Sequence, residues 1–306
     1  MDKKTLDALN DISANSRGSA VFLNESLSRH TTIRIGGTVS VWYEPGTPEE
    51  LSFSLSVLKK KKIRVIVIGN GSNVLMPDGH LDAVVIKLAG DAFDYAHFNG
   101  GMVSAGAGTH LPRLVSECAS RGLAGMEGLV GIPGTVGGGI VLNAGYRTSI
   151  SDRLLNVEIL TSKGRITRRK KEEINFAYRR SSFDRNDIII GAVFELDPVR
   201  DAPYLRERLR DLFVKKMISQ PLDEKTLGCV FRNPEDRETG SGRMIDLAGL
   251  KGMREGGAVV SEKHGNFIVN SGGATASDVR KLMKTVSVRV KERFSVDFVP
   301  EINILE

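Results

Sequence analysis

The chain has 306 residues, of which 41% are hydrophobic and 26% are charged, as in ordinary globular proteins. This length allows two domains with a sizeable core. The 43 basic and 37 acidic residues give a formal charge of +6. The basic runs Lys59–Lys62 and Arg168–Lys171 have no aromatic residues between them, so we expect solvated segments and no nucleic-acid interface. A modestly basic protein also suits an anionic small substrate.

The cysteines, the histidines and the apolar runs argue against a secreted, membrane-spanning or metal-binding protein. The two cysteines, Cys118 and Cys229, have neither CxxC nor metal-ligand spacing, which predicts a reducing compartment. The polar N-terminus lacks the apolar stretch of a signal peptide, and no apolar run approaches the ~18 residues of a membrane span. We therefore expect a soluble, cytoplasmic protein that contacts no membrane. The histidines are scattered without ligand spacing, so no metal site is expected: His30, His80, His97, His110 and His264.

The first third of the chain predicts strands around one helix. Residues 31–45 are typical of a strand pair interrupted at Gly36 and Gly37. Residues 47–62 predict a helix, because Thr47 suits the N-cap and Glu50 completes a capping box. Residues 63–69 then predict a buried strand that runs directly into a glycine turn.

The remaining elements predict an α+β fold. One helix is expected at 109–122, with Thr109 as its cap and Gly122 as its stop. Two more are expected at 200–217 and 275–294, the second with a capping box of Thr275 and Asp278. Short β runs lie at 83–88, 102–106, 154–160, 164–168, 187–196 and 298–305. Strands and helices do not alternate regularly, which disfavours a doubly wound sheet.

Glycine clusters carry the cofactor signal. GNGSN (69–73) follows a strand, GAG spans 106–108, and a third glycine-rich run spans 128–145. No GxxxxGK[ST] motif is present, and GNGSNV lacks the third glycine of a Rossmann fingerprint. Each cluster alone fits a plain turn. Together they predict backbone-lined contacts to a long diphosphate cofactor.

Several ordered motifs resemble the UDP-N-acetylenolpyruvoylglucosamine reductase family. They are RIGG (34–37), GNGSNVLMPDG (69–79), GIPGTVGGGIVLNAG (131–145), FAYRRSSF (176–183), LGCVFRNP (227–234), GRMIDLAGLKG (242–252), SEKHGNFIVN (261–270) and PEINIL (300–305). The resemblance covers nearly the whole chain beyond the first twenty residues. It implies an N-terminal extension (1–21), an FAD-binding domain of the vanillyl-alcohol-oxidase (PCMH) type (22–198) and a smaller α+β substrate domain (199–306).

The resemblance also implies a reaction. NADPH reduces a non-covalently bound FAD, and the flavin N5 hydride then adds to the vinyl carbon of UDP-N-acetylglucosamine enolpyruvate. Protonation of the adjacent carbon gives UDP-N-acetylmuramate for peptidoglycan. The expected partners are these small molecules alone, and we expect a monomer. The chain is short between Arg180 and Gln220, which indicates the subgroup without the substrate-covering tyrosine loop.

Three residues match the family's catalytic positions. Arg179 matches the arginine, whose guanidinium can grip a carboxylate and neutralise its developing charge. Cys229 stands where many members carry a proton-donating serine, and an ordinary thiol, titrating near ~8.5, is a stronger acid than a hydroxyl. Glu301 matches the catalytic glutamate. Without the resemblance, these would be a solvated arginine, a small core residue and an edge-strand carboxylate.

The same resemblance assigns binding residues. Tyr178, Arg179 and Asn233 match substrate contacts, while Arg232 replaces the usual lysine and the diphosphate-binding lysine is either Lys215 or Lys216. The residues that match FAD contacts are Arg34, Gly69, Asn70, Gly71, Ser72, Asn73, Gly131, Ile132, Pro133, Gly134, Thr135, Gly137, Gly138, Asn143, Ala144 and Gly145.

Two other functions are compatible with the glycine clusters. An FAD-dependent oxidase could use the same cofactor fold, but such enzymes often tether the flavin through histidine or cysteine, and no attachment motif is evident. A non-catalytic protein could bind flavin or a nucleotide sugar, but the retained arginine, acid and glutamate argue against it.

Overall fold

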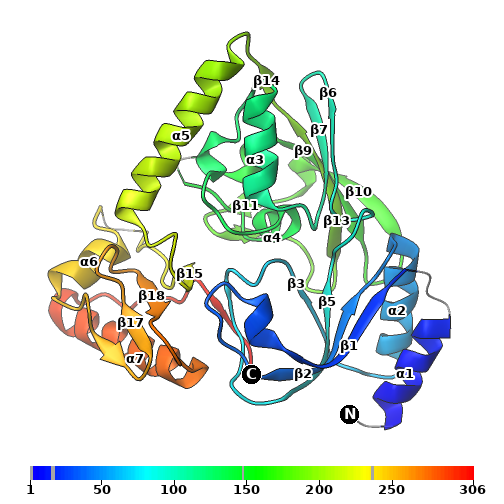
Figure 1. Ribbon diagram of the computed structural model, residues 1–306, viewed down its shortest axis with the longest axis horizontal. Helices are drawn as coiled ribbons and strands as arrows, with labels where there is room; N and C mark the ends of the chain where they lie inside the picture. Colours follow the sequence, from blue (N-terminus) through cyan, green and yellow to red (C-terminus); the bar gives the residue numbers. More distant parts are fainter. Residues whose placement is uncertain (1–2, 15–17, 147, 236–237) are drawn as a thin grey trace. The chain divides into compact units, whose positions relative to one another are not determined.

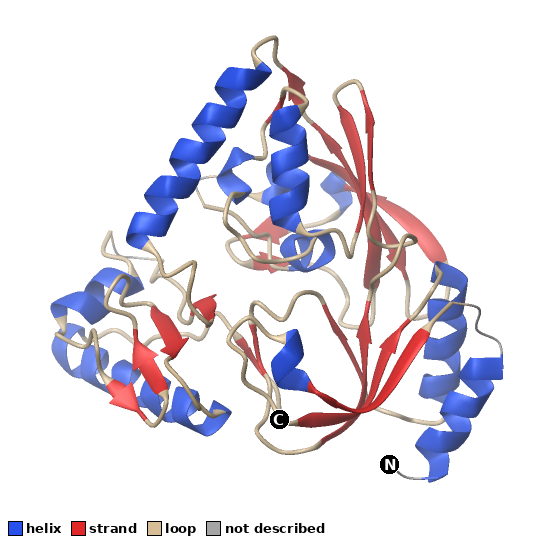
Figure 2. Cartoon of the chain, viewed as in Figure 1, coloured by secondary structure: helices blue, strands red, loops and turns tan. Residues whose placement is uncertain are grey.

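The computed structural model describes residues 3–14, 18–146, 148–235 and 238–306 (Figures 1 and 2). Contacts among Cα atoms divide the chain into two compact units. The first unit comprises Met1–Glu25, Val39–Asn70 and Asp82–Phe213, and the second comprises Ser26–Thr38, Gly71–Leu81 and Val214–Glu306. Each unit mixes helices and strands around a hydrophobic cluster of its own, which confirms the α+β class.

The first unit is built on two sheets. The four-stranded sheet has the order β1-β2-β5-β3, with β3 parallel to β5, and the five-stranded sheet has the antiparallel order β10-β9-β13-β7-β6. Their strands are β1 (Ala20–Ser26), β2 (Thr38–Glu44), β3 (Val65–Ile68), β5 (Leu81–Lys87), β6 (Ala96–Asn99), β7 (Met102–Gly106), β9 (Leu154–Leu160), β10 (Ile166–Lys170) and β13 (Ile188–Glu195). Two short antiparallel pairs join β8 (Leu123–Ala124) to β14 (Asp197–Pro198) and β11 (Phe176–Ala177) to β12 (Arg180–Ser181).

The predicted helices form, but two of them are capped differently from the prediction. The predicted helices that begin in the first unit are α2 (Pro48–Lys60), α3 (Leu111–Ser120) and α5 (Ala202–Ser219), and the caps of α2 and α3 differ from the prediction. The Thr47 hydroxyl accepts the Glu50 N–H (3.2 Å), but the Glu50 carboxylate accepts from Gly46 N–H (2.8 Å). Thr109 does not cap α3, because its hydroxyl donates to the Tyr95 carbonyl (2.8 Å) and His110 occupies the N-cap.

The first twenty residues contain a helix that packs against the first unit. This helix, α1 (Lys3–Ala14), contacts α2 (Figure 1). Its residues Leu9 and Ile12 are buried, and Asp11 pairs with Lys61 at 3.0 Å. The expected polar extension is therefore amphipathic, with one apolar face in the core.

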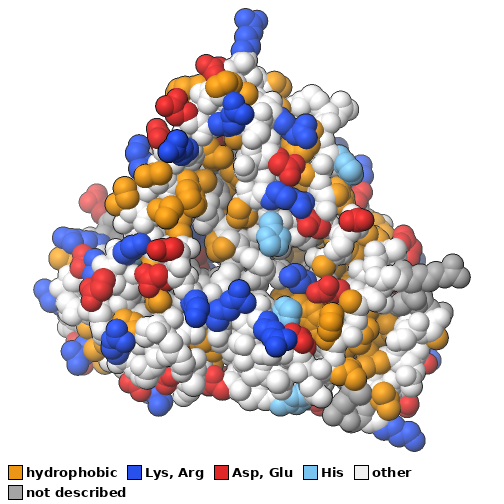
Figure 3. All heavy atoms as spheres, viewed as in Figure 1, with side chains coloured by type: hydrophobic (Ala, Val, Ile, Leu, Met, Phe, Trp, Pro, Cys, Tyr) orange, Lys and Arg blue, Asp and Glu red, His pale blue; other side chains and the backbone are white. Residues whose placement is uncertain are grey.

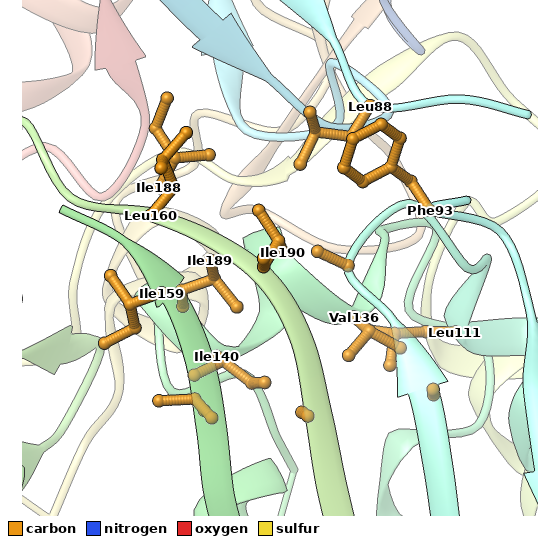
Figure 4. Packing of buried hydrophobic residues seen from close by; sticks show 14 of the residues in the cluster. Leu88, Phe93, Leu111, Val136, Ile140, Ile159, Leu160, Ile188, Ile189 and Ile190 are labelled. Carbon is orange, nitrogen blue, oxygen red and sulfur yellow. The ribbon is translucent and has the colours of Figure 1, made fainter. Parts of the chain in front are cut away.

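The core of the first unit fixes the short helix α4 (Val136–Val141). Val136 and Ile140 are fully buried. Ile140 lies near Ile159 of β9 and Ile189 of β13, and Val136 lies beside Leu111 of α3 (Figure 4). Each such side chain stabilises the fold by roughly 1.5–3 kcal/mol when it is withdrawn from water. Packing on the sheet therefore holds α4, and with it the glycine-rich segment, in place.

The second unit has one antiparallel sheet of order β15-β18-β17-β16, with two helices. Its elements are β4 (Val74–Leu75), β15 (Thr226–Cys229), α6 (Ser241–Leu247), β16 (Arg254–Glu255), β17 (Ala258–Val260), β18 (Phe267–Asn270), α7 (Ala276–Phe294) and β19 (Asn303–Ile304). The predicted capping box of Thr275 and Asp278 is confirmed. The sequence missed a further cap, in which the Asp78 carboxylate accepts the N–H groups of Ala276 (2.6 Å) and Ser277 (2.9 Å).

Three predicted strands differ from the observed ones. Residues 31–37 form no strand, because Arg34 and Gly36 have φ values of +60° and +144°. The expected final strand shortens to β19, with an isolated bridge between Phe231 and Pro300. The strand β3 forms, but Val67 is 40% exposed, so it is only partly buried.

No helix in the described part of the chain is long and apolar enough to cross a membrane. Among the same residues, no group of three or more His, Cys, Asp or Glu side chains could hold a metal ion. Figure 3 shows basic and acidic side chains interspersed on one face.

Candidate active site

The start of GNGSN and the other two predicted glycine clusters meet in the first unit. The Asn70 side chain donates to the Pro133 carbonyl (2.9 Å), which joins the turn after β3 to the run before α4. The Gly137 N–H donates to the Ala107 carbonyl (2.8 Å), which joins that run to the GAG turn. Segments from three parts of the sequence therefore form one backbone-rich surface.

Close approach explains the glycine at two of these positions. A Cβ atom on Gly69 would lie 2.5 Å from the Thr135 hydroxyl oxygen, and one on Gly137 would lie 3.0 Å from the Ala107 Cβ. Real Cβ atoms essentially never approach as closely as the Cβ at Gly69 would, so a larger residue there would push the segments apart; a Cβ at Gly137 would require Ala107 to shift slightly. Thr135 also caps α4 by accepting the Gly138 N–H (3.4 Å).

The remaining residues of GNGSN and the RIGG motif lie in the second unit, because the division falls between Asn70 and Gly71. Gly71 has a φ of +59°, and a Cβ there would lie 2.1 Å from the His30 carbonyl oxygen. The Gly37 N–H donates to the Pro77 carbonyl (2.8 Å), so RIGG packs against the end of the GNGSNVLMPDG motif. Arg34 donates from Nη1 to the Arg29 carbonyl (2.8 Å).

Asn143, in the NAG turn after α4, tests whether these residues fit a flavin cofactor. Asn143 is 8% exposed, and its Nδ2 donates to the Ala177 carbonyl (3.1 Å). Among the described residues, none donates a hydrogen bond to its Oδ1. A buried acceptor without a donor is costly, and FAD carries imide and hydroxyl donors that suit it. The residues present therefore fit FAD.

Arg179 lies in the tight turn between β11 and β12. It has a φ of +53°, a conformation that non-glycine residues rarely adopt. Its Nη1 donates to the Gly145 carbonyl (2.9 Å), and its guanidinium carbon lies 5.4 Å from the centre of the Tyr178 ring. Tyr178 is 46% exposed. The structure thus places two of the predicted substrate residues side by side, next to the predicted cofactor residue Gly145.

Cys229 and Glu301 lie on adjacent segments of the second unit. Cys229 ends β15 opposite Phe267, after a register shift at Gly228, whose φ is +77°. The Glu301 N–H donates to the Val230 carbonyl (2.8 Å), and the Asn73 side chain donates to the Glu301 carbonyl (3.2 Å). The predicted glutamate is therefore hydrogen-bonded through its backbone to Val230, the residue that follows the predicted acid Cys229.

The sequence did not predict Asn266, which holds the segment after Cys229. Its amide forms two bonds with Phe231, accepting from the N–H (3.0 Å) and donating to the carbonyl (2.7 Å). Its own carbonyl accepts the Val230 N–H (2.9 Å), and its side chain is 2% exposed. An asparagine inside the apolar run 265–269 is the signal that points to such a clamp.

Asn233 has a structural partner besides its predicted role with substrate. Its Oδ1 accepts the Ser241 N–H (3.0 Å) at the start of α6. The neighbouring Arg232 has a buried Nε without a hydrogen-bond partner among the described residues. Lys215 is exposed, whereas Lys216 is 8% exposed.

The other cysteine has the properties of a core residue, as predicted. Cys118 is 1% exposed, and its Sγ contacts the Met126 sulfur at 3.9 Å. Burial, with a smaller contribution from Glu117, raises the pKa of the Cys118 thiol to about 12. Cys118 therefore serves as an unreactive counterpart to the half-buried Cys229.

Comparisons with known proteins decide the family. Residues 39–169 match an FAD binding domain, and residues 220–305 match the C-terminal domain of UDP-N-acetylenolpyruvoylglucosamine reductase. The reductase of that name from Moorella thermoacetica is 39% identical over 285 residues, which cover 93% of each chain. The chain belongs to the UDP-N-acetylenolpyruvoylglucosamine reductase family. The resemblance found in the sequence is thereby confirmed.

Further relatives of the family agree. The reductase of Bacillus subtilis is 36% identical over 288 residues, which cover 93% of this chain and 94% of that one. The crystal structure of UDP-N-acetylenolpyruvylglucosamine reductase from Thermus caldophilus aligns with a TM-score of 0.79 at 36% identity, covering 94% of this chain and 99% of that one. This chain is an FAD-dependent oxidoreductase with an FAD-binding domain.

Proposed function

We propose that this protein reduces UDP-N-acetylglucosamine enolpyruvate to UDP-N-acetylmuramate for peptidoglycan, with NADPH as the electron donor and FAD bound non-covalently. The observation that carries the proposal is the backbone hydrogen bond from the Glu301 N–H to the carbonyl of Val230, which brings the segment of Glu301 beside the segment of Cys229. Cys229 and Glu301 are the acid and the glutamate that the family's reaction requires. We further propose that the protein works as a cytoplasmic monomer with small molecules as its only partners.

Arg179 stabilises the charge that develops on the substrate. The chemistry that FAD supplies when bound is hydride transfer, first from NADPH and then to the vinyl carbon of the enolpyruvyl group. Hydride addition moves negative charge onto the enolpyruvyl carboxylate. The Arg179 guanidinium binds that carboxylate through parallel N–H bonds and stabilises the enediolate form.

Cys229 completes the reaction by supplying a proton. Its Sγ–H bond breaks, the proton joins the carbon next to the new C–H bond, and the carbon–carbon double bond becomes single. The thiolate that remains regains a proton from solvent. Glu301, protonated or acting through a water molecule, donates a hydrogen bond to the enol oxygen, which lowers the free energy of the intermediate.

Substitution of the two cysteines tests this assignment. Cys229→Ala is expected to leave the reduction of FAD by NADPH unchanged and to slow reoxidation by the enolpyruvyl substrate by about 10²–10⁴-fold, the usual contribution of a positioned acid. Cys229→Ser should recover part of the rate, because a hydroxyl also donates a proton. Stopped-flow absorbance in the absence of oxygen measures both half-reactions.

Cys118→Ala is the matched control, because it removes a buried thiol that is not part of the proposed chemistry. It should leave both half-reactions at the wild-type rates. Full turnover by Cys229→Ala would overturn the proposed proton donor. A flavin that resists release by acid would instead favour an oxidase with a covalently tethered cofactor.

A further inference from the structure

Three hydrogen bonds connect the NAG segment to the hairpin that carries Arg179, all within the first unit. Each joins a side chain to a backbone carbonyl across the two segments. They run from Ser181 Oγ to Val141 O (2.6 Å), from Asn143 Nδ2 to Ala177 O (3.1 Å) and from Arg179 Nη1 to Gly145 O (2.9 Å). The hairpin is therefore bound at β11, at its turn and at β12 to the end of α4 and to the NAG segment that follows it.

The hairpin needs this attachment because its own pairing is weak. Only two residue pairs join β11 to β12, and an isolated two-stranded hairpin is marginally stable at best. Two-residue hairpin turns usually place a positive φ at the first turn residue or at both. Among the described residues, Arg179 at the second turn position has a positive φ, and Tyr178 at the first does not. The turn thus departs from the favoured form and carries a cost of about 1–2 kcal/mol at Arg179.

Asn143 is suited to hold this hairpin. Its φ of +44° is a left-handed conformation after a helix end, which asparagine tolerates better than most residues. Its N–H donates to the Ile140 carbonyl (3.1 Å), so the helix end fixes its backbone. Because the side chain is buried, loss of its Nδ2 donor would leave the Ala177 carbonyl without this partner.

We propose, on the basis of the proposed reductase function, that Asn143 is a positioning residue that holds the Arg179 turn in its left-handed conformation through the Ala177 carbonyl, with Ser181 as a second anchor. Asn143 acts through the hairpin backbone, and Arg179 alone touches the substrate carboxylate. Its Oδ1, which has no partner among the described residues, is available to the cofactor, so one amide links the flavin side of the turn to the substrate side.

Two variants test the proposal by a measurement that needs no activity. Asn143→Gly keeps the left-handed backbone but removes the amide, and Ser181→Ala removes the second anchor. Both should raise the rate of amide hydrogen exchange in residues 176–181 by about fivefold to tenfold, as expected for loss of one hydrogen bond. Mass spectrometry of the FAD-bound protein measures the exchange.

Ser52→Ala is the matched control for Ser181→Ala. The Ser52 hydroxyl also donates to a backbone carbonyl, that of Gly164 (3.1 Å), in a partly exposed position of the same unit. Its loss should leave exchange in residues 176–181 unchanged. If exchange there is equally slow in Asn143→Gly and in the wild type, Asn143 does not hold the turn and the proposal is wrong.

The half-reactions separate positioning from a purely cofactor-binding role. Ser181→Ala should raise the KM for the enolpyruvyl substrate and slow reoxidation about tenfold, with reduction by NADPH within twofold of wild type, because Ser181 contacts the hairpin anchor and is not a predicted cofactor residue. Asn143→Gly should slow reoxidation by at least the same factor. Equal slowing of both half-reactions by Ser181→Ala would contradict the proposal. If the wild-type flavin is not reoxidised by this substrate, the proposed function fails, while the exchange result still decides the role of Asn143.

Discussion

Two left-handed backbone positions, one in each unit, show different solutions to the same conformational problem. Gly228 reaches a φ of +77° at the register shift before Cys229, and a Cβ there would meet no heavy atom within 4 Å. Arg179 reaches a φ of +53° with its own long side chain. Glycine pays no steric cost in this conformation, whereas arginine does.

The difference follows from where the reactive group lies. In the second unit the bend precedes the reactive residue, so a glycine can make it and Cys229 keeps an ordinary strand conformation. In the first unit the guanidinium is needed at the bend itself, which excludes glycine there. External hydrogen bonds must then hold the turn, as those to Ala177 and Gly145 do.

The largest expected effect is the loss of activity when Arg179 is replaced. Arg179→Lys keeps a positive charge but loses the planar fork of donors, and Arg179→Ala loses both. We expect reoxidation by the enolpyruvyl substrate to slow by about 10²–10³-fold in Arg179→Ala and by less in Arg179→Lys. Single-turnover absorbance measures the rates. Equal rates for wild type and Arg179→Ala would show that the strained turn has no catalytic purpose.

A smaller effect on stability sharpens the same comparison. Arg179→Gly and Arg179→Ala both lack the guanidinium, but only glycine relieves the left-handed strain. Arg179→Gly should therefore be more stable than Arg179→Ala by about 1 kcal/mol in the free energy of unfolding. Gly228→Ala should be less stable than wild type by about the same amount. Urea unfolding with saturating FAD measures both, and an alanine as stable as glycine at either position would contradict the comparison.

Much of the fold could be predicted from local sequence patterns. Strands β7 and β9 match their predicted ranges, and α7 begins at its predicted cap Thr275, because alternation and capping are read from neighbouring residues. The strand expected at 31–35 does not form. Contacts with residues distant in sequence determine the backbone there instead of the local pattern; for example, the Gly37 N–H donates to the Pro77 carbonyl.

The site could be predicted in its residue types but not in its supports. Motif resemblance pointed to Arg179, Cys229 and Glu301, whose proposed roles remain to be tested. The polar Asn266 beside an apolar run indicates a buried clamp, but nothing local identifies Phe231, 35 residues away, as its partner, or Ala177 as the partner of Asn143. Such links depend on tertiary packing, which spacing along the chain does not encode.

The absorbance spectrum of the purified protein in the absence of oxygen tests the central claim most directly. The account predicts a flavin spectrum that NADPH bleaches and that an equimolar amount of UDP-N-acetylglucosamine enolpyruvate restores, with UDP-N-acetylmuramate as the product. A reduced flavin that is reoxidised only when oxygen is admitted would contradict the account and indicate an oxidase. A folded protein without flavin would contradict the cofactor assignment itself.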